Sequence, residues 1–208
     1  MIAYSRQRWL VWLGGLWLAG CVSFHLPSAA PPVYYQLDYQ PPGVHCPRAF
    51  NKGVRVWKFT TSSPYDRTEM VVLKPEGQVM FSSAFQWVAS PGTLVSESLL
   101  RDLAQTKLFP RVVGANDPAN TPLELSGHVF VFGWERSGAT SRAVLQVSLS
   151  LVDTTAPRRV ILRREYSLRS EAWGDDSSAA FARAMSGLVA QFSADFQHDL
   201  CNCLSNSR

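Results

Sequence analysis

The chain has 208 residues and a formal net charge of +4. This length fits one domain with a short extension, and the weak charge, without a basic run, does not indicate nucleic-acid binding. Because it lacks a Gly-rich phosphate loop and the Gly-x-Ser-x-Gly and His-Glu-x-x-His motifs, we expect neither an enzyme nor a cofactor site.

The first twenty residues have the three parts of a secretory signal peptide. Two arginines form a positive flank, and the apolar run at 9–18 is shorter than the roughly 20 residues of a membrane-spanning helix. The run ends on Leu-Ala-Gly-Cys at positions 18–21, which resembles the bacterial lipobox. We therefore predict cleavage between Gly20 and Cys21, with lipid on Cys21. An ordinary cleaved signal and an uncleaved anchor are the alternatives.

Residues 21–33 begin with the predicted lipid-bearing cysteine and are rich in proline, which is typical of a short, stiff tether. Val22, rather than Asp, follows Cys21. Lipoproteins that resemble this one in that neighbour usually pass to the outer membrane in proteobacteria. We expect a lipid anchor at the periplasmic face of the outer membrane, with the inner membrane as the alternative, and a folded domain over 34–203.

Short runs of valine and aromatic residues in the first half of the domain are typical of half-buried strands. They predict strands at 34–38, 54–60, 68–74 and 78–84, with a turn between the last two at 74–77. A helix is expected over 91–108, because Ser90 suits the N-cap and Pro91 the first helical position. Its apolar residues recur every four positions on one face.

A loop rich in proline and asparagine is expected at 114–122, before three longer strands at 124–134, 142–151 and 159–169. The strand at 142–151 alternates between apolar and polar residues. The strand at 124–134 is apolar on both faces, which predicts a central position or a face offered to a partner.

A last helix is predicted over 177–200, where Asp175 and Asp176 would complement the helix dipole. Its apolar stripe, from Phe181 to Phe196, is typical of packing against a sheet. Together the elements predict a single α+β domain, a mostly antiparallel sheet with two amphipathic helices packed on one face.

Three cysteines remain when Cys21 carries lipid, and an oxidising compartment permits a disulfide among them. Cys46 could pair with either Cys201 or Cys203, whereas direct pairing of the last two would close a strained ring. A metal site that adds His198 lacks a fourth ligand, so we predict none.

One ordered set of motifs carries a family resemblance. Tyr34-Tyr35-Gln36-Leu37 opens the domain, and Trp87-Val-Ala-Ser-Pro91 leads into the first helix. A long strand that begins Leu-Ser-Gly-His-Val, a second long strand and an alanine-rich final helix follow. This order behind a lipobox resembles the ABC-type transport auxiliary lipoprotein family over most of residues 34–200.

The resemblance implies a non-catalytic lipoprotein component of a lipid transport system of the mammalian-cell-entry (MCE) type. Its partners would be the periplasmic MCE protein, on which it would dock, and the ABC permease and ATPase. A ring of identical copies is one arrangement that the resemblance allows. Five residues, Tyr34, Tyr35, Leu37, Trp87 and Pro91, match the family pattern, with architecture favoured over partner contact as their role. Cys46 and the Cys201-Asn-Cys203 tail depart from a typical member.

Two other functions are compatible with the same sequence. An outer-membrane assembly lipoprotein that supports a β-barrel protein would have a similar size and anchor. A periplasmic carrier that acts alone would need an enclosed apolar pocket, for which the strand at 124–134 could supply a face. The identity of the partner separates these hypotheses.

Overall fold

The computed structural model describes residues 30–174 and 177–206, and the part from Pro32 onward is one compact unit. The predicted signal peptide, Cys21, most of the tether, Asp175 and Asp176 lie outside the described residues. The elements are β1 (Val33–Tyr35), β2 (Val54–Val56), β3 (Thr60–Thr61), η1 (Ser63–Tyr65), β4 (Glu69–Leu73), η2 (Pro75–Gly77), β5 (Val79–Trp87), α1 (Pro91–Gln105), β6 (Val112–Gly114), β7 (Leu123–Ser137), β8 (Thr140–Asp153), β9 (Arg159–Arg169) and α2 (Ser178–Asn206).

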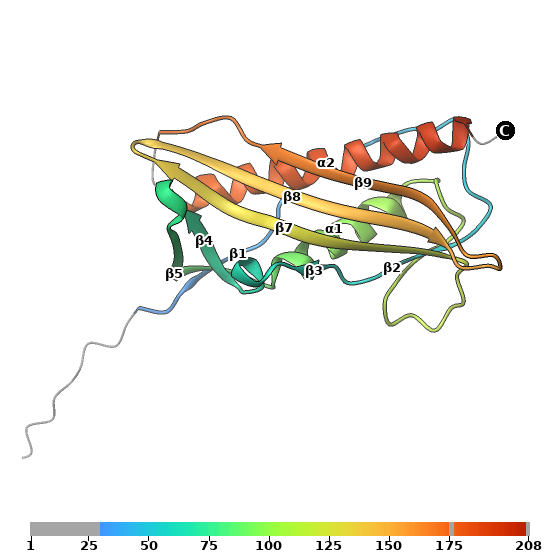
Figure 1. The fold of residues 1–208 in the computed structure, drawn as a ribbon, viewed down its shortest axis with the longest axis horizontal. Helices are drawn as coiled ribbons and strands as arrows, with labels where there is room; N and C mark the ends of the chain where they lie inside the picture. The colour runs from blue at the N-terminus through green and yellow to red at the C-terminus, as the bar shows by residue number, and fades with distance from the viewer. Residues whose placement is uncertain (1–29, 175–176, 207–208) are drawn as a thin grey trace, which may run out of the picture. The chain divides into compact units, whose positions relative to one another are not determined.

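The strands of the described part form one curled, mixed sheet organised by β7 (Figure 1). One edge of β7 pairs along its length with β8, and β8 pairs with β9, both antiparallel. The other edge pairs in turn with β2, β3 and β4, all parallel. Two further parallel pairings join β1 to β5 and β2 to β6.

The expectation of a mostly antiparallel sheet is therefore wrong, because five of the eight pairings between described strands are parallel. The three antiparallel pairings join strands that follow each other through short turns. The parallel pairings join strands that are far apart in the sequence, and such pairings require crossover connections.

Both helices lie on the same face of the sheet, where they enclose the core (Figure 1). The alternation expected in β8 is present, since its apolar residues on this face are buried while the intervening serines are partly exposed. The apolar stripe of α2 packs against them. Its buried members are Phe181, Met185, Leu188, Val189, Phe192, Phe196 and Leu200.

The start of α1 is held by β3 rather than by the predicted serine cap. Ser90 takes the N-cap position, but its hydroxyl lies 3.2 Å from the hydroxyl of Thr93 and caps no backbone N–H. The amide of Gly92 instead donates to Oγ1 of Thr61 (3.0 Å). A Cβ on Gly92 would overlap the carbonyl oxygen of Phe59, so this close approach requires glycine.

Several element boundaries differ from the predicted ones. The strand expected at 54–60 is divided into β2 and β3, and the intervening Phe59 is buried in the core. The helix expected at 91–108 ends at Gln105, where the amide and hydroxyl of Thr106 both bond to the carbonyl of Leu103. β6 was not predicted, and it forms just before the expected loop.

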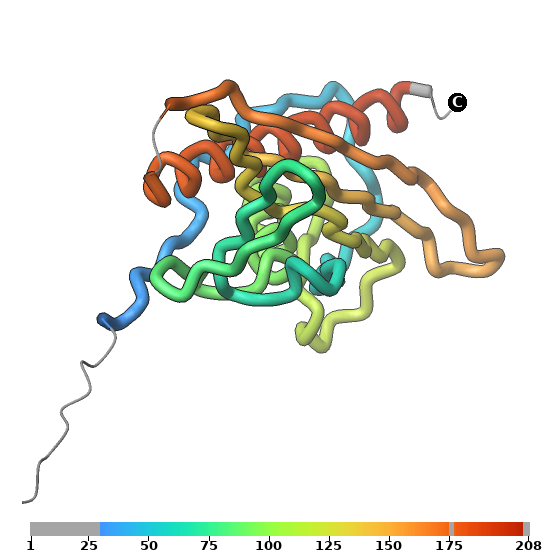
Figure 2. Tube along the Cα trace, turned by 60° about the vertical axis from the view of Figure 1, so that its left-hand side comes forward, coloured from blue at the N-terminus to red at the C-terminus, as the bar shows by residue number. Residues whose placement is uncertain are grey.

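The segment from 36 to 50 has no regular structure and runs beside α2 (Figure 2). The amide of Asp38 donates to the hydroxyl of Ser186 (3.0 Å), which fixes the start of the segment to this helix. Cys46 forms a disulfide with Cys201, with 5.4 Å between the Cα atoms. The guanidinium of Arg48 also donates to the carbonyl oxygen of Leu204 (3.4 Å), so the segment is attached to α2 at three places.

Candidate interaction surface

The five residues of the family pattern gather where β1 meets β5 and α1. Parallel pairing sets Tyr34 opposite Gln86 and Tyr35 opposite Trp87. Trp87 is 1% exposed and packs edge-to-face on Phe132 and Phe181, at 5.2 and 5.6 Å between ring centroids. The indole therefore joins β5 to both β7 and α2.

Three more residues of the family pattern also contribute to the packing or the elements of the fold. The hydroxyl of Tyr35 lies 3.0 Å from that of Ser178 at the start of α2. Leu37 is buried, and Pro91 is the first residue of α1. Tyr34 differs from them, because its side chain is 58% exposed. Four of the five residues therefore have a role in packing, hydrogen bonding or helix entry within the domain. The fifth, Tyr34, lies at the surface.

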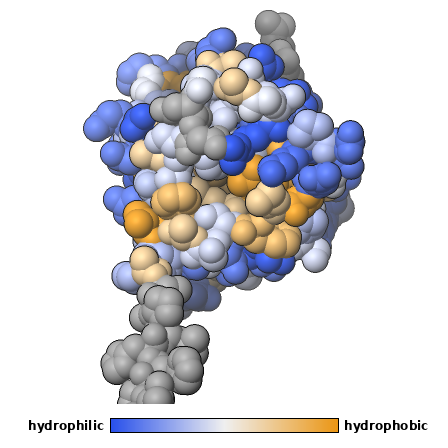
Figure 3. All heavy atoms as spheres, turned by 90° about the vertical axis from the view of Figure 1, so that its left-hand side faces the viewer, coloured by the Kyte–Doolittle hydropathy of each residue, from blue (hydrophilic) through white to orange (hydrophobic). Residues whose placement is uncertain are grey.

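Tyr34 belongs to a group of exposed apolar side chains at one end of the sheet, which we call the end face. Its residues come from β1, from the β4–β5 hairpin and from the residue that follows β5. Their exposed fractions lie between 41% and 58%. They are Val33, Tyr34, Val79, Met80, Phe81 and Val88. Hydrophobic residues gather on this side of the molecule in the space-filling view (Figure 3).

The geometry of β5 explains why the hairpin part of the end face is exposed. Between two paired positions, Glu69–Gln86 and Val71–Phe81, β5 contains three more residues than β4. This bulge is closed by a hydrogen bond from the amide of Phe85 to Oγ of Ser82 (3.0 Å). A bulge bends its strand and increases the local twist, and beyond it the hairpin has no covering helix (Figure 1).

A cation holds the ring of Phe81 on this surface. The guanidinium of Arg67 lies over that ring, 3.7 Å from its centroid, a cation–π arrangement. The sequence pattern predicts a half-buried strand at 78–84, so this exposed surface was not predicted. The available signal was the run Val79-Met80-Phe81 directly after a turn, since three successive apolar residues cannot all face one side of a strand.

The cysteines lie at the opposite end of α2 from the end face (Figure 1). Cys46 and Cys201 form the disulfide, and the thiol of Cys203 donates to the carbonyl oxygen of Ile161 in β9 (3.8 Å). His198 is exposed on α2. Within the described residues, no group of three His, Cys, Asp or Glu side chains is arranged to hold a metal ion.

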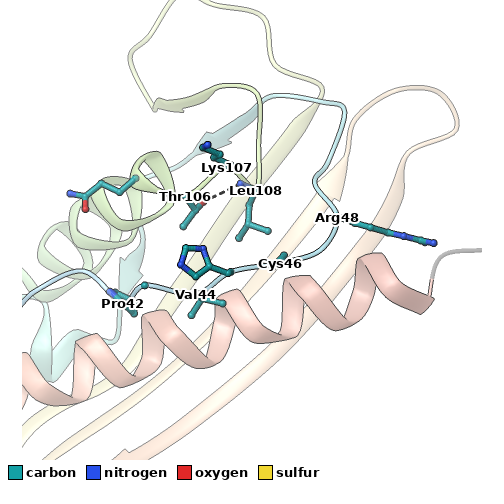
Figure 4. Close-up of a pocket in the computed structure, with 10 residues that line it drawn as sticks. Pro42, Val44, Cys46, Arg48, Thr106, Lys107 and Leu108 are labelled. Atoms are coloured by element: carbon teal, nitrogen blue, oxygen red, sulfur yellow. Dashed lines mark hydrogen bonds between the residues drawn. The ribbon is translucent and has the colours of Figure 1, made fainter.

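A pocket of about 280 Å³ lies between the 42–48 segment and the end of α1. Its lining includes His45 and Lys107 but no carboxylate. The hydroxyl of Thr106 donates to the carbonyl of Leu103 (2.8 Å) and accepts from the amide of Leu108 (3.3 Å), the dashed line in Figure 4. The side chain of Arg48 points away from the pocket (Figure 4). Thr106 supplies the one hydroxyl among the lining side chains, and both of its hydrogen bonds are to main-chain atoms.

A serine lies beside a histidine on the other face of the sheet. Nε2 of His128 is 3.0 Å from Oγ of Ser62, and Nδ1 is 2.7 Å from Oγ1 of Thr60. A serine–histidine catalytic pair is normally oriented by a carboxylate at the second ring nitrogen, and here a threonine hydroxyl takes that place. The cluster links the β3 region to β7.

The comparisons with known proteins agree with this fold. The family model of the ABC-type transport auxiliary lipoprotein component matches residues 35–196. The structure is similar to that of a protein from Xanthomonas campestris, with a TM-score of 0.69 at 16% identity over 79% of this chain and 91% of that one. It is also similar to a solved uncharacterized protein, with a TM-score of 0.63 at 16% identity over 82% and 99% of the two chains. No curated protein matches the sequence.

In the part of the chain that the structure describes, no helix is long and apolar enough to cross a membrane. The family model covers more than half of the chain, from Tyr35 in β1 to Phe196 in α2. It therefore includes α1, the larger part of α2 and β2 to β9. The chain belongs to the ABC-type transport auxiliary lipoprotein family.

Proposed function

We propose that this chain is a non-catalytic, lipid-anchored component of an ABC/MCE-type intermembrane lipid transport system and docks on the periplasmic MCE protein. The observation that carries the proposal is the family match over residues 35–196 behind a lipobox that ends at Cys21. ATP would be consumed by the transporter, and this chain would supply a membrane-attached docking module.

The arrangement of polar groups supports a non-catalytic role. General-base activation of a hydroxyl requires a base within hydrogen-bond reach that is itself oriented by a third group. Thr106, in the pocket beside α1, is bonded to backbone on both sides. Ser62 has a histidine neighbour, but both ring nitrogens of His128 are bound by hydroxyl groups. The two hydroxyls and the histidine serve to connect segments of the fold.

The test is a crosslinked pull-down of the lipidated protein from membranes, with the partners identified by mass spectrometry. We expect an MCE-domain protein together with its ABC permease or ATPase. The Cys21→Ser variant is the control, because it cannot receive the lipid and should lose these partners. Recovery of a β-barrel protein without any transporter subunit would reject the proposal and favour the outer-membrane assembly role.

We also propose that the anchor lies in the outer membrane, on the periplasmic face, because Val22 follows Cys21. Density-gradient separation of the two membranes tests this directly. The wild-type chain should sediment with the outer membrane, and the Val22→Asp variant should remain in the inner membrane. Wild-type protein in the inner-membrane fraction would contradict the assignment.

A further inference from the structure

We propose that the end face lies against the lipid bilayer to which Cys21 is attached, so that its apolar side chains enter the headgroup region. The inference rests on the lipid anchor in the proposed function, and it is independent of which transporter the chain serves. It assigns a membrane-contact surface to side chains outside the core, and of the five family-pattern residues only Tyr34 is among them.

The place where the tether joins the domain supports this contact. Val33 and Tyr34 are both half exposed or more, and they are the first two residues of β1. The tether therefore enters the domain at the end face itself. Residues 22–33 span at most about 40 Å when fully extended, at roughly 3.3–3.6 Å per residue, so this end of the domain cannot lie far from the lipid.

The chemistry of the end face also suits a membrane interface. Apolar side chains, a tyrosine with one wet end and nearby cations are typical of proteins that lie in a membrane interface. Phe81 and Met80 are 46% and 47% exposed, and the guanidinium of Arg67 stacks on the Phe81 ring. Lys74 follows β4 in the same hairpin. Both cations could reach phosphate headgroups. The β4–β5 hairpin also carries two carboxylates, the exposed Glu76 at the turn and the half-buried Glu69 opposite Gln86.

The outer face of the β7–β8–β9 part of the sheet differs in composition from the end face. That surface carries polar residues such as Ser148, Ser150 and Glu165. Its exposed apolar ring is Phe130, which is 38% exposed and packs edge-to-face on His128. Isolated exposed apolar residues are common, whereas a contiguous group marks a protein or membrane contact. The polar sheet face thus remains available to water or protein when the end face meets lipid.

The test places the photoreactive phenylalanine analogue p-benzoylphenylalanine at one aromatic position at a time. The positions are Tyr34 and Phe81 in the end face, with Phe130 as the matched control. Each full-length, lipidated variant is reconstituted into vesicles of phosphatidylethanolamine and phosphatidylglycerol, irradiated and analysed by mass spectrometry for lipid adducts. A cooperative thermal unfolding transition in each sample verifies that the variant is folded.

We expect at least tenfold more lipid adduct at Tyr34 and Phe81 than at Phe130. Equal yields at the three positions would overturn the proposal. Adducts between two protein chains at Tyr34 and Phe81, in place of lipid, would overturn it as well and would show that the end face joins copies of the chain. The vesicles contain no transporter, so this outcome and that of the pull-down are independent of each other.

Discussion

The phenol of Tyr39 donates a hydrogen bond of 2.7 Å to the carboxylate of Asp102 on α1. Asp102 is fully buried and also pairs with Arg101 (2.8 Å), whose guanidinium lies over the Tyr39 ring. Burial, and then the bond to Asp102, raise the pKa of Tyr39 well above its ordinary value. The 36–50 segment is therefore attached to α1 through Tyr39, in addition to its attachments to α2.

Tyr39→Phe should lower the free energy of unfolding by about 1–3 kcal/mol, because Asp102 would lose a partner in a place that water cannot reach. Urea unfolding measures this change. Tyr34→Phe is the matched control, since it removes the same hydroxyl from an exposed ring, and its effect should stay below about 0.5 kcal/mol. Equal effects of the two substitutions would contradict the assigned role of the Tyr39–Asp102 bond.

Removing the Cys46–Cys201 disulfide should lower the free energy of unfolding more than Tyr39→Phe does. Replacing both partners, as Cys46→Ala with Cys201→Ala, should reduce the free energy of unfolding by roughly 3–5 kcal/mol. The reason is that the bond spans 155 positions and restricts the unfolded chain. The control is Cys203→Ser, which leaves the disulfide intact and can still donate to Ile161. If the double variant and the control unfold at the same urea concentration, the disulfide does not stabilise the fold.

Trp87→Ala should destabilise the domain by about 3–5 kcal/mol, because it opens a cavity between β5, β7 and α2. Trp57→Ala is a suitable comparison, since this indole is 39% exposed and lies beside Arg55 at the surface. Its effect should remain near 1 kcal/mol or less. Thermal and urea unfolding of the two variants would separate a core role from a surface role of tryptophan.

Asp153 gives the domain a specific sensitivity to acid. Nζ of Lys52 lies 2.6 Å from its carboxylate, and Thr155 donates to it from both hydroxyl and amide. These bonds, that of Lys52 first, lower the pKa of Asp153 from 3.8 to about 2. Because the folded pKa is below the unfolded one, the stabilisation is present above about pH 4 and is lost as the pH falls towards about 2.

The free energy of unfolding should therefore fall more between about pH 5 and about pH 2 in the wild-type chain than in the Asp153→Asn variant. Urea unfolding at a series of pH values tests this difference. Parallel curves for the two proteins, separated by a constant amount, would contradict the lowered pKa of Asp153.

The periodicity and the capping residues of a segment predicted those elements that depend on neighbouring residues alone. Pro91 and the four-residue spacing of Val95, Leu99 and Leu103 located α1, and strict alternation located β8. The parallel pairings could not be predicted in this way, because the partner of a strand is not encoded in its own periodicity. β1 pairs with β5 some fifty positions away, and nothing in Tyr34 or Tyr35 indicates that choice.

The candidate surface was predicted only in part for a related reason. Tyr34 and Trp87 were found through their family pattern, but the exposure of Met80 and Phe81 depends on the bulge in β5 and on Arg67. An apolar strand of this composition is normally half buried. The Tyr39–Asp102 bond was not predicted either, because a tyrosine in an irregular segment carries no signal for a buried carboxylate on a distant helix.

The disulfide also sets how the domain responds to a pulling force. If the anchored end is pulled while a partner holds the domain, the load enters at β1, which has only three residues. β1 and the following residues can detach up to Cys46, where the covalent bond passes the load into α2. Stretching can therefore release only the chain before Cys46. The other strands of the sheet and both helices stay assembled under a tension that detaches β1.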